Sequence, residues 1–145
     1  MTTDAWLAIA HHVAVFTLLG SLAAEWALVQ PGLTPAAAAR VARIDLVYGI
    51  SAGAVVVFGI LRLVFGAKDF DFYSGNPLFW LKMASLAAVA VLSIRPTLAY
   101  FRWQKVEFAV SDSDVAAVHQ SLLRQLAVFP LIPIFAALMA RDIGN

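Results

Sequence analysis

Long apolar stretches separated by short polar links dominate the chain. We expect them to form membrane spans at about residues 5–29, 42–66, 77–101 and 116–140. Each stretch exceeds the roughly 20 helical residues that cross the hydrocarbon core of a bilayer. Because short links join consecutive spans, the pattern predicts an all-α, integral membrane, up-and-down four-helix bundle that forms a single domain over residues 1–145.

Capping residues mark the predicted helix ends. Side-chain oxygens accept hydrogen bonds from the first free N–H groups of a helix, and proline is tolerated at its first position. Starts are therefore expected at Thr3-Asp4, Thr34-Pro35, Asn76-Pro77 and Ser111 to Asp114. Stops are expected at Gln30-Pro31-Gly32, Gly66 and Ile143-Gly144. Pro130 and Pro133 lie inside the last apolar stretch and predict a break in its backbone hydrogen bonds.

Composition supports a membrane protein and excludes several functions. The chain is 62% hydrophobic and 13% charged, with a mean hydropathy of +0.84, whereas soluble domains are about 25% charged. A net charge of +1 argues against a nucleic-acid partner. Because the chain has no cysteine, a metal would need histidine, methionine or carboxylate ligands.

Basic residues predict the orientation in the membrane. Arg40 and Arg43 flank the first link, and Arg102, Lys105 and Arg124 flank the third, whereas the second link has only Lys68 beside acidic residues. The positive-inside rule then places both termini on the outer side of the membrane, which in a bacterial inner membrane is the periplasmic side. In this orientation Trp26, Tyr100 and Trp103 are expected to form an aromatic belt at the inner face.

Basic groups from three spans are expected near the outer face. They are His11 and His12 of the first span, Arg62 of the second and Lys82 of the third. With no carboxylate expected at that depth, an anion or an electron-rich macrocycle would relieve their repulsion. Haem b would do so, because imidazole can hold its iron and cations can neutralise its propionates. Histidines that bond a neighbouring carbonyl, with cations that extend to the interface, are the structural alternative.

The choice of haem ligands remains open at this stage. His11 and His12 are adjacent, so their side chains point about 100° apart and only one can face a given pocket. Met83 and Met139, both expected on the outer side, are candidate second ligands.

Charges of both signs are expected near the inner face. They are Glu25, Arg43, Asp45, Arg95 and Arg124. Ion pairs between helices would explain how the bundle tolerates them. A proton or quinone path, with Glu25 as the titrating group and Tyr48 as a relay, is the functional alternative.

Several runs resemble known membrane proteins. His11-His12-Val-Ala-Val-Phe, Ala42 to Gly49, Leu61 to Lys68 and Asn76 to Met83 resemble an uncharacterised group of bacterial four-span inner-membrane proteins over nearly the whole chain. The order of Trp6, His11 or His12, Arg43, Trp80 to Lys82, Arg124 and Pro130 is distantly similar to HemJ-type protoporphyrinogen oxidases and CopD-like proteins. That similarity implies haem b on His11 or His12 with Lys82 near the porphyrin. Glu25 and Val128-Phe129-Pro130 depart from the HemJ pattern.

These observations give three hypotheses. The first is a protein that binds haem b or another tetrapyrrole and acts in electron transfer or porphyrin oxidation, with a quinone or a respiratory complex as a partner. The second is a homo-oligomer or an accessory subunit of a larger membrane complex, without catalysis. The third is a protein that handles copper or a small solute through His11, His12 and methionines.

Overall fold

The computed structural model describes residues 2–66, 68 and 70–144, so the first and last residues of the predicted domain lie outside it. Its helices are α1 (Thr3–Leu28), α2 (Pro35–Phe65), α3 (Phe70–Ser74), α4 (Pro77–Lys105), α5 (Asp112–Val128) and α6 (Leu131–Met139). The described residues contain no strand. Four helical segments, α1, α2, α4 and α5 with α6, are long and apolar enough to cross a membrane. The predicted all-α, four-span fold class is confirmed.

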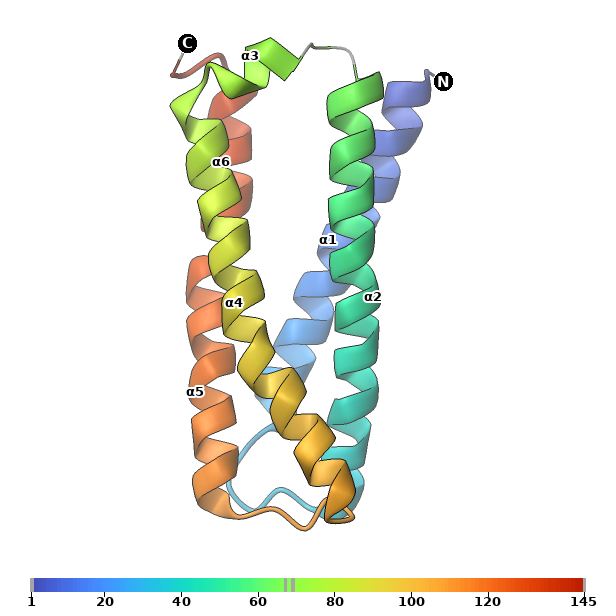
Figure 1. Cartoon of the computed structure of the whole chain (residues 1–145), viewed down its shortest axis with the longest axis vertical. Coiled ribbons are helices and arrows are strands. Elements are labelled where there is room, and N and C mark those ends of the chain that lie inside the picture. The colour runs from blue at the N-terminus through green and yellow to red at the C-terminus, as the bar shows by residue number, and fades with distance from the viewer. Residues whose placement is uncertain (1, 67, 69, 145) are drawn as a thin grey trace.

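The helices form two groups, and the helices that pack together within each group run antiparallel. In Figure 1, α1 lies along α2, and α4 lies along α5 and α6. Contacts within each group are far more numerous than contacts between them. Both termini and α3 lie at one end of the bundle, which we call the terminal end, and the α1–α2 and α4–α5 links lie at the opposite end (Figure 1). Because both termini lie at the same end, the arrangement agrees with an up-and-down bundle. The location of this end on the outer side of the membrane stays a prediction.

Most predicted helix ends are confirmed by their caps. The side chains of Thr34, Asn76 and Ser111 accept hydrogen bonds from the first free N–H groups of α2, α4 and α5. The cap of α1 is Thr2, one residue before the predicted start. Helix α2 ends at Phe65, and Gly66 is its C-cap, as expected.

The end of the last span differs from the prediction. Helix α6 ends at Met139 rather than at Ile143-Gly144. Asp142 (φ 55°) and Gly144 (φ 94°) take left-handed backbone conformations, so the chain continues as turns. The Asn76 amide donates to the Ile143 carbonyl (3.1 Å), which ties these turns to the start of α4.

Proline interrupts the last span as predicted. Helix α5 ends at Val128 and α6 begins at Leu131, so the break falls at Pro130. Pro130 has no N–H to donate, and its own carbonyl accepts a hydrogen bond from the N–H of Ile134 (3.2 Å). The carbonyl of Phe129, which Pro133 cannot use, accepts from the N–H of Ile132 (3.1 Å). The chain therefore continues as two helical segments.

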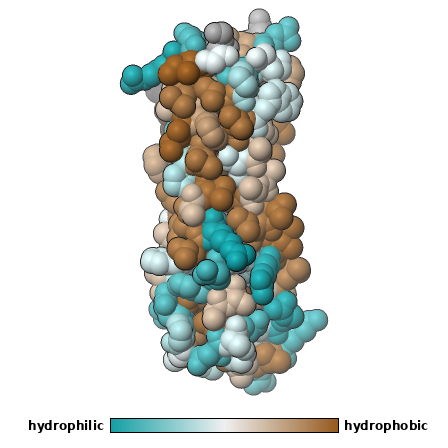
Figure 2. Space-filling view, turned by 90° about the vertical axis from the view of Figure 1, so that its left-hand side faces the viewer, coloured by the Kyte–Doolittle hydropathy of each residue, from teal (hydrophilic) through white to brown (hydrophobic). Residues whose placement is uncertain are grey.

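Small and polar residues lie inside the bundle together with a core of larger apolar side chains, and many other large apolar residues lie outside. Buried positions of α1 include Ala14, Ser21 and Glu25 at helical spacing, whereas Phe16 is 69% exposed. Only 17% to 22% of the most apolar window of each span is buried. This distribution suits lipid, because apolar side chains need no shelter there and small residues let helices approach closely. Figure 2 shows the side that carries α5 and α6, where a hydrophobic surface covers the half nearer the terminal end.

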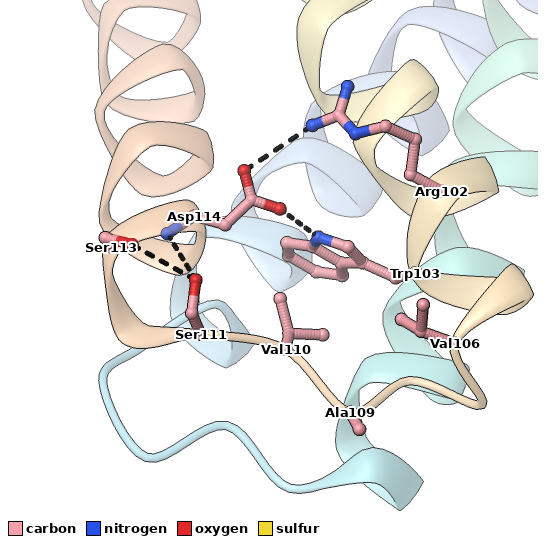
Figure 3. Close-up of a pocket in the computed structure, with 8 residues that line it drawn as sticks. All are labelled: Arg102, Trp103, Val106, Ala109, Val110, Ser111, Ser113 and Asp114. Carbon is pink, nitrogen blue, oxygen red and sulfur yellow. Dashed lines mark hydrogen bonds and ion pairs between the residues drawn. The ribbon is translucent and has the colours of Figure 1, made fainter.

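Asp114 joins α4 to α5 at the opposite end (Figure 3). Its Oδ2 accepts a hydrogen bond from Nε1 of Trp103 (2.5 Å), and its Oδ1 pairs with Nη2 of Arg102 (3.4 Å). Ser111 caps α5 through the N–H of Asp114 (3.4 Å). These residues line a surface hollow of about 600 Å³. Because Trp103 is 2% exposed, its contact with Asp114 fixes the link to the core.

Candidate functional site

His11 points from α1 toward α2. A Cβ atom on Gly59 of α2 would lie 3.6 Å from Cε1 of His11, so the missing side chain of Gly59 provides the space for the imidazole. The backbone of Val55, one turn earlier on α2, lies within hydrogen-bonding reach of the ring. Nδ1 of His11 is buried and has no hydrogen-bond partner among the described residues.

Two cations from other spans act electrostatically on this imidazole. The positive charges of Arg62 on α2 and Lys82 on α4 both act on His11, and the charge of Arg62 acts on Lys82. All three side chains are half-buried. Nζ of Lys82 also lies 5.2 Å from the centre of the Phe79 ring. We call His11, Arg62 and Lys82 the basic cluster.

The basic cluster lacks a paired carboxylate within the described part of the chain. The ion pairs found there join Lys68 with Asp142 and Arg102 with Asp114, and neither includes a member of the cluster. Asp4 approaches Gly66 at the end of α2 but forms no ion pair with Arg62. Nε of Arg62, like Nδ1 of His11, is buried and unpartnered among the described residues. The cluster therefore has positive charge and unused hydrogen-bonding capacity.

The other predicted cofactor ligands differ from His11 in their exposure and their contacts. His12 is exposed, and its Nδ1 lies 2.6 Å from the carbonyl of Ala8, so it turns back on its own helix. Met83 is 38% exposed on α4, whereas Met139 at the end of α6 is 4% exposed. The structure thus distinguishes the two histidines, which the sequence could not, and leaves Met139 as the buried methionine of the predicted pair.

The copper hypothesis stays a prediction. No group of three His, Cys, Asp or Glu side chains that could hold a metal ion occurs in the described ranges. The rings of His11 and His12 are 6.1 Å apart between their centroids, whereas His12 and Met83 are exposed.

Two carboxyl groups, one buried and one half-buried, lie in the other predicted layer. Glu25 of α1 is 1% exposed, and its Oε2 accepts a hydrogen bond from the hydroxyl of Tyr100 on α4 (2.9 Å). Oδ1 of Asp45 on α2 accepts from the hydroxyl of Thr97 on α4 (2.9 Å). Asp45 acts electrostatically on Glu25. Oε1 of Glu25 is buried and unpartnered among the described residues.

The predicted ion pairs in this layer are wrong. Arg43, Arg95 and Arg124 are exposed, and none of them pairs with Glu25 or Asp45. Their positions on the helices turn them away from the bundle interior, so hydroxyl groups supply the donors instead. The carboxylate layer, Glu25 and Asp45 with Thr97 and Tyr100, therefore has no paired cation among the residues that the structure describes.

A second set of hydrogen bonds adjoins this layer. The hydroxyl of Tyr48 on α2 donates to Oε1 of Gln125 on α5 (3.0 Å), and Nε2 of Gln125 donates to the carbonyl of Leu92 on α4 (3.4 Å). Ser121 donates to the same carbonyl (2.9 Å). These bonds join three helices across the interior. Gln125 is 1% exposed and Tyr48 is 6% exposed.

Sequence reasoning missed Thr97 and Gln125, and it did not predict the hydrogen bond of Tyr100. Tyr100 and Trp103 were expected in an aromatic belt at the surface, but they are 3% and 2% exposed and pack against each other at 5.2 Å. The available signal was spacing, because Thr97 and Tyr100, like Ser121 and Gln125, are polar pairs on one helical face within an apolar stretch.

A family model described as a predicted membrane protein (DUF2214) matches residues 3–144. The chain belongs to this family. The match confirms the predicted resemblance to an uncharacterised membrane-protein group, and its description gives no activity. No curated protein and no solved structure matches the chain. The distant similarity to HemJ-type and CopD-like proteins stays a prediction.

For this family member, a groove runs beside the carboxylate layer. It lies between α2 and α4, has a volume of about 470 Å³ and is lined mainly by apolar side chains. Its polar lining includes Asp45, Thr97 and Tyr100, so the groove reaches the hydrogen bonds of the carboxylate layer. The groove and the basic cluster are separate sites, because Asp45 and Arg62 are about 25 Å apart along α2.

Proposed function

We propose that this multi-pass membrane protein binds haem b, or a related tetrapyrrole, at the basic cluster and acts in electron transfer or porphyrin oxidation. The observation that supports the proposal is the electrostatic effect of Arg62 and Lys82 on His11, from three spans, without a paired carboxylate among the described residues.

The electrostatics of the basic cluster favour an anionic ligand. Positive groups in a region of low dielectric constant raise one another's energy, and intramembrane cations are normally paired. Arg62 and Lys82 have no such pair in the described chain. A bound anion would remove the repulsion between them and give the unpartnered Nε of Arg62 an acceptor.

The residues present fit haem b in number and kind. His11 provides one imidazole, and the two cations match the two propionates of the porphyrin. Of the two predicted methionine ligands, Met139 on α6 is buried and Met83 on α4 is exposed. When bound, haem would supply one-electron chemistry at its iron. Gly59 would keep the His11 ring oriented by leaving room for it, and Arg62 and Lys82 would fix the carboxylate side of the macrocycle.

Haemin titration of the purified protein in detergent tests this proposal. We expect a Soret band that saturates at one haem per chain and shifts on reduction with dithionite. Arg62→Gln and Lys82→Gln should each weaken binding about tenfold, which corresponds to about 1.4 kcal/mol. Arg141→Gln, which removes an exposed cation at the same end, is the matched control. A titration without saturation, or equal affinity in all variants, would overturn the proposal.

A further inference from the structure

We propose that the groove between α2 and α4 binds an amphiphilic organic cation, a protonated amine or a quaternary onium ion with an apolar body. The charged end of this ligand would lie at Asp45, and its apolar body would lie along the groove. This site is independent of the basic cluster and of haem.

The walls of the groove suit a ligand that arrives through the membrane. Leu46, Ile50 and Phe101 line it and are 64%, 66% and 61% exposed. Because these side chains face lipid, the groove is open laterally. Its volume of about 470 Å³ lies within the roughly 300–1,000 Å³ of small-molecule sites. An apolar molecule dissolved in the bilayer can therefore reach the polar end of the groove.

The charges at that polar end call for a cation. Asp45 lines the groove, and Glu25 lies behind it, bonded to Tyr100, which also lines the groove. Asp45 acts electrostatically on Glu25. Neither forms an ion pair with any described residue, and Arg43 and Arg95 on the neighbouring turns are exposed. Two acidic side chains near one another in a membrane region thus have no paired cation in the described part of the chain.

Unused hydrogen-bonding capacity gives independent support. Glu25 is 1% exposed, and its Oε1 has no hydrogen-bond partner among the described residues. A buried carboxylate oxygen without a donor is costly, and a positive charge at Asp45 would lower that cost. The aromatic rings of Tyr100 and Phe101 line the same groove, and aromatic faces attract organic cations. A neutral amphiphile such as a quinone would leave both carboxylates uncompensated.

Equilibrium dialysis with radiolabelled tetraphenylphosphonium tests the charge requirement on the purified protein in detergent. We expect saturable binding that Asp45→Asn weakens at least about tenfold. Asp71→Asn, which removes one negative charge from an exposed position at the terminal end, should bind as the wild type does. Equal binding by both variants would overturn the proposal, as would binding by a neutral ubiquinone analogue that displaces the cation and is insensitive to Asp45→Asn.

Two glycines on α2 provide a steric test that leaves the carboxylates intact. Gly49 lines the groove, and Gly53, one turn further, does not. A Cβ atom at either position would have no neighbour within 4 Å, so both accept a side chain without a backbone clash. Gly49→Leu should abolish binding of tetraphenylphosphonium, and Gly53→Leu should preserve it. Binding retained by Gly49→Leu would place the cation elsewhere. His11→Ala should not change this binding, which separates the proposal from haem binding.

Discussion

The hydroxyl of Tyr100 on α4 donates a hydrogen bond of 2.9 Å to Oε2 of Glu25 on α1. Both side chains are buried, at 3% and 1% exposure. This bond crosses between the two helix groups, which contact each other much less than the helices within each group do. Polar bonds in the carboxylate layer are therefore expected to contribute strongly to the association of the two groups.

Tyr100→Phe should lower the free energy of unfolding by about 1–3 kcal/mol, because it leaves a buried carboxylate without its donor. Titration with sodium dodecyl sulfate, followed by circular dichroism, measures the loss. Tyr73→Phe is the control, because its hydroxyl makes no hydrogen bond with another described residue and should change stability little. An equal effect of the two substitutions would contradict the role given to the Tyr100 hydroxyl.

Tyr48 and Gln125 should be energetically coupled. Their hydrogen bond of 3.0 Å joins α2 to α5, and a double-mutant cycle with Tyr48→Phe and Gln125→Leu isolates it. We expect a coupling energy of about 0.5–1.5 kcal/mol, as for other hydrogen bonds between membrane helices. Additive losses in the cycle would show that this bond does not stabilise the bundle.

The two contacts of Asp114 should differ in their contribution to stability. Trp103→Phe removes a buried donor at 2.5 Å and should lower the unfolding free energy by about 1–3 kcal/mol. Arg102→Gln removes an ion pair whose side chains are 59% and 36% exposed and should change it by less than about 1 kcal/mol. Thermal unfolding in detergent ranks the two variants. The reverse order would contradict the geometry.

Gly59 should tolerate alanine but not leucine. A Cβ atom there meets Cε1 of His11 at 3.6 Å, which is ordinary van der Waals contact. A leucine side chain would displace the imidazole. We therefore expect Gly59→Ala to keep wild-type haemin affinity and Gly59→Leu to lose about tenfold or more. Equal affinity in both variants would show that His11 does not need this space.

Much of the fold could be predicted from the sequence. Thr34, Asn76 and Ser111 mark helix starts because their side chains satisfy free N–H groups locally, within a few residues. Pro130 interrupts the last span for an equally local reason, the missing N–H. The end of α6 was placed too late, because the left-handed conformation of Asp142 is not encoded by residue type alone.

The candidate sites depend on rotations of the helices that a single sequence does not define. Counting along the helix could not choose between His11 and His12, and only the packing of α1 on α2 shows that His11 faces Gly59. Arg43 and Arg95 lie at the right depth to pair with Glu25, but they face outward. Depth follows from position along the chain, whereas the facing of a side chain follows from packing.

The visible spectrum of haemin-reconstituted His11→Ala and His12→Ala variants tests the central claim most directly. These residues are adjacent in the chain, so the substitutions match in depth and chemistry, and only His11 belongs to the basic cluster. Our account predicts that His11→Ala loses the wild-type Soret band and its shift on reduction, while His12→Ala retains both. Loss in His12→Ala alone, or retention in both variants, would contradict it.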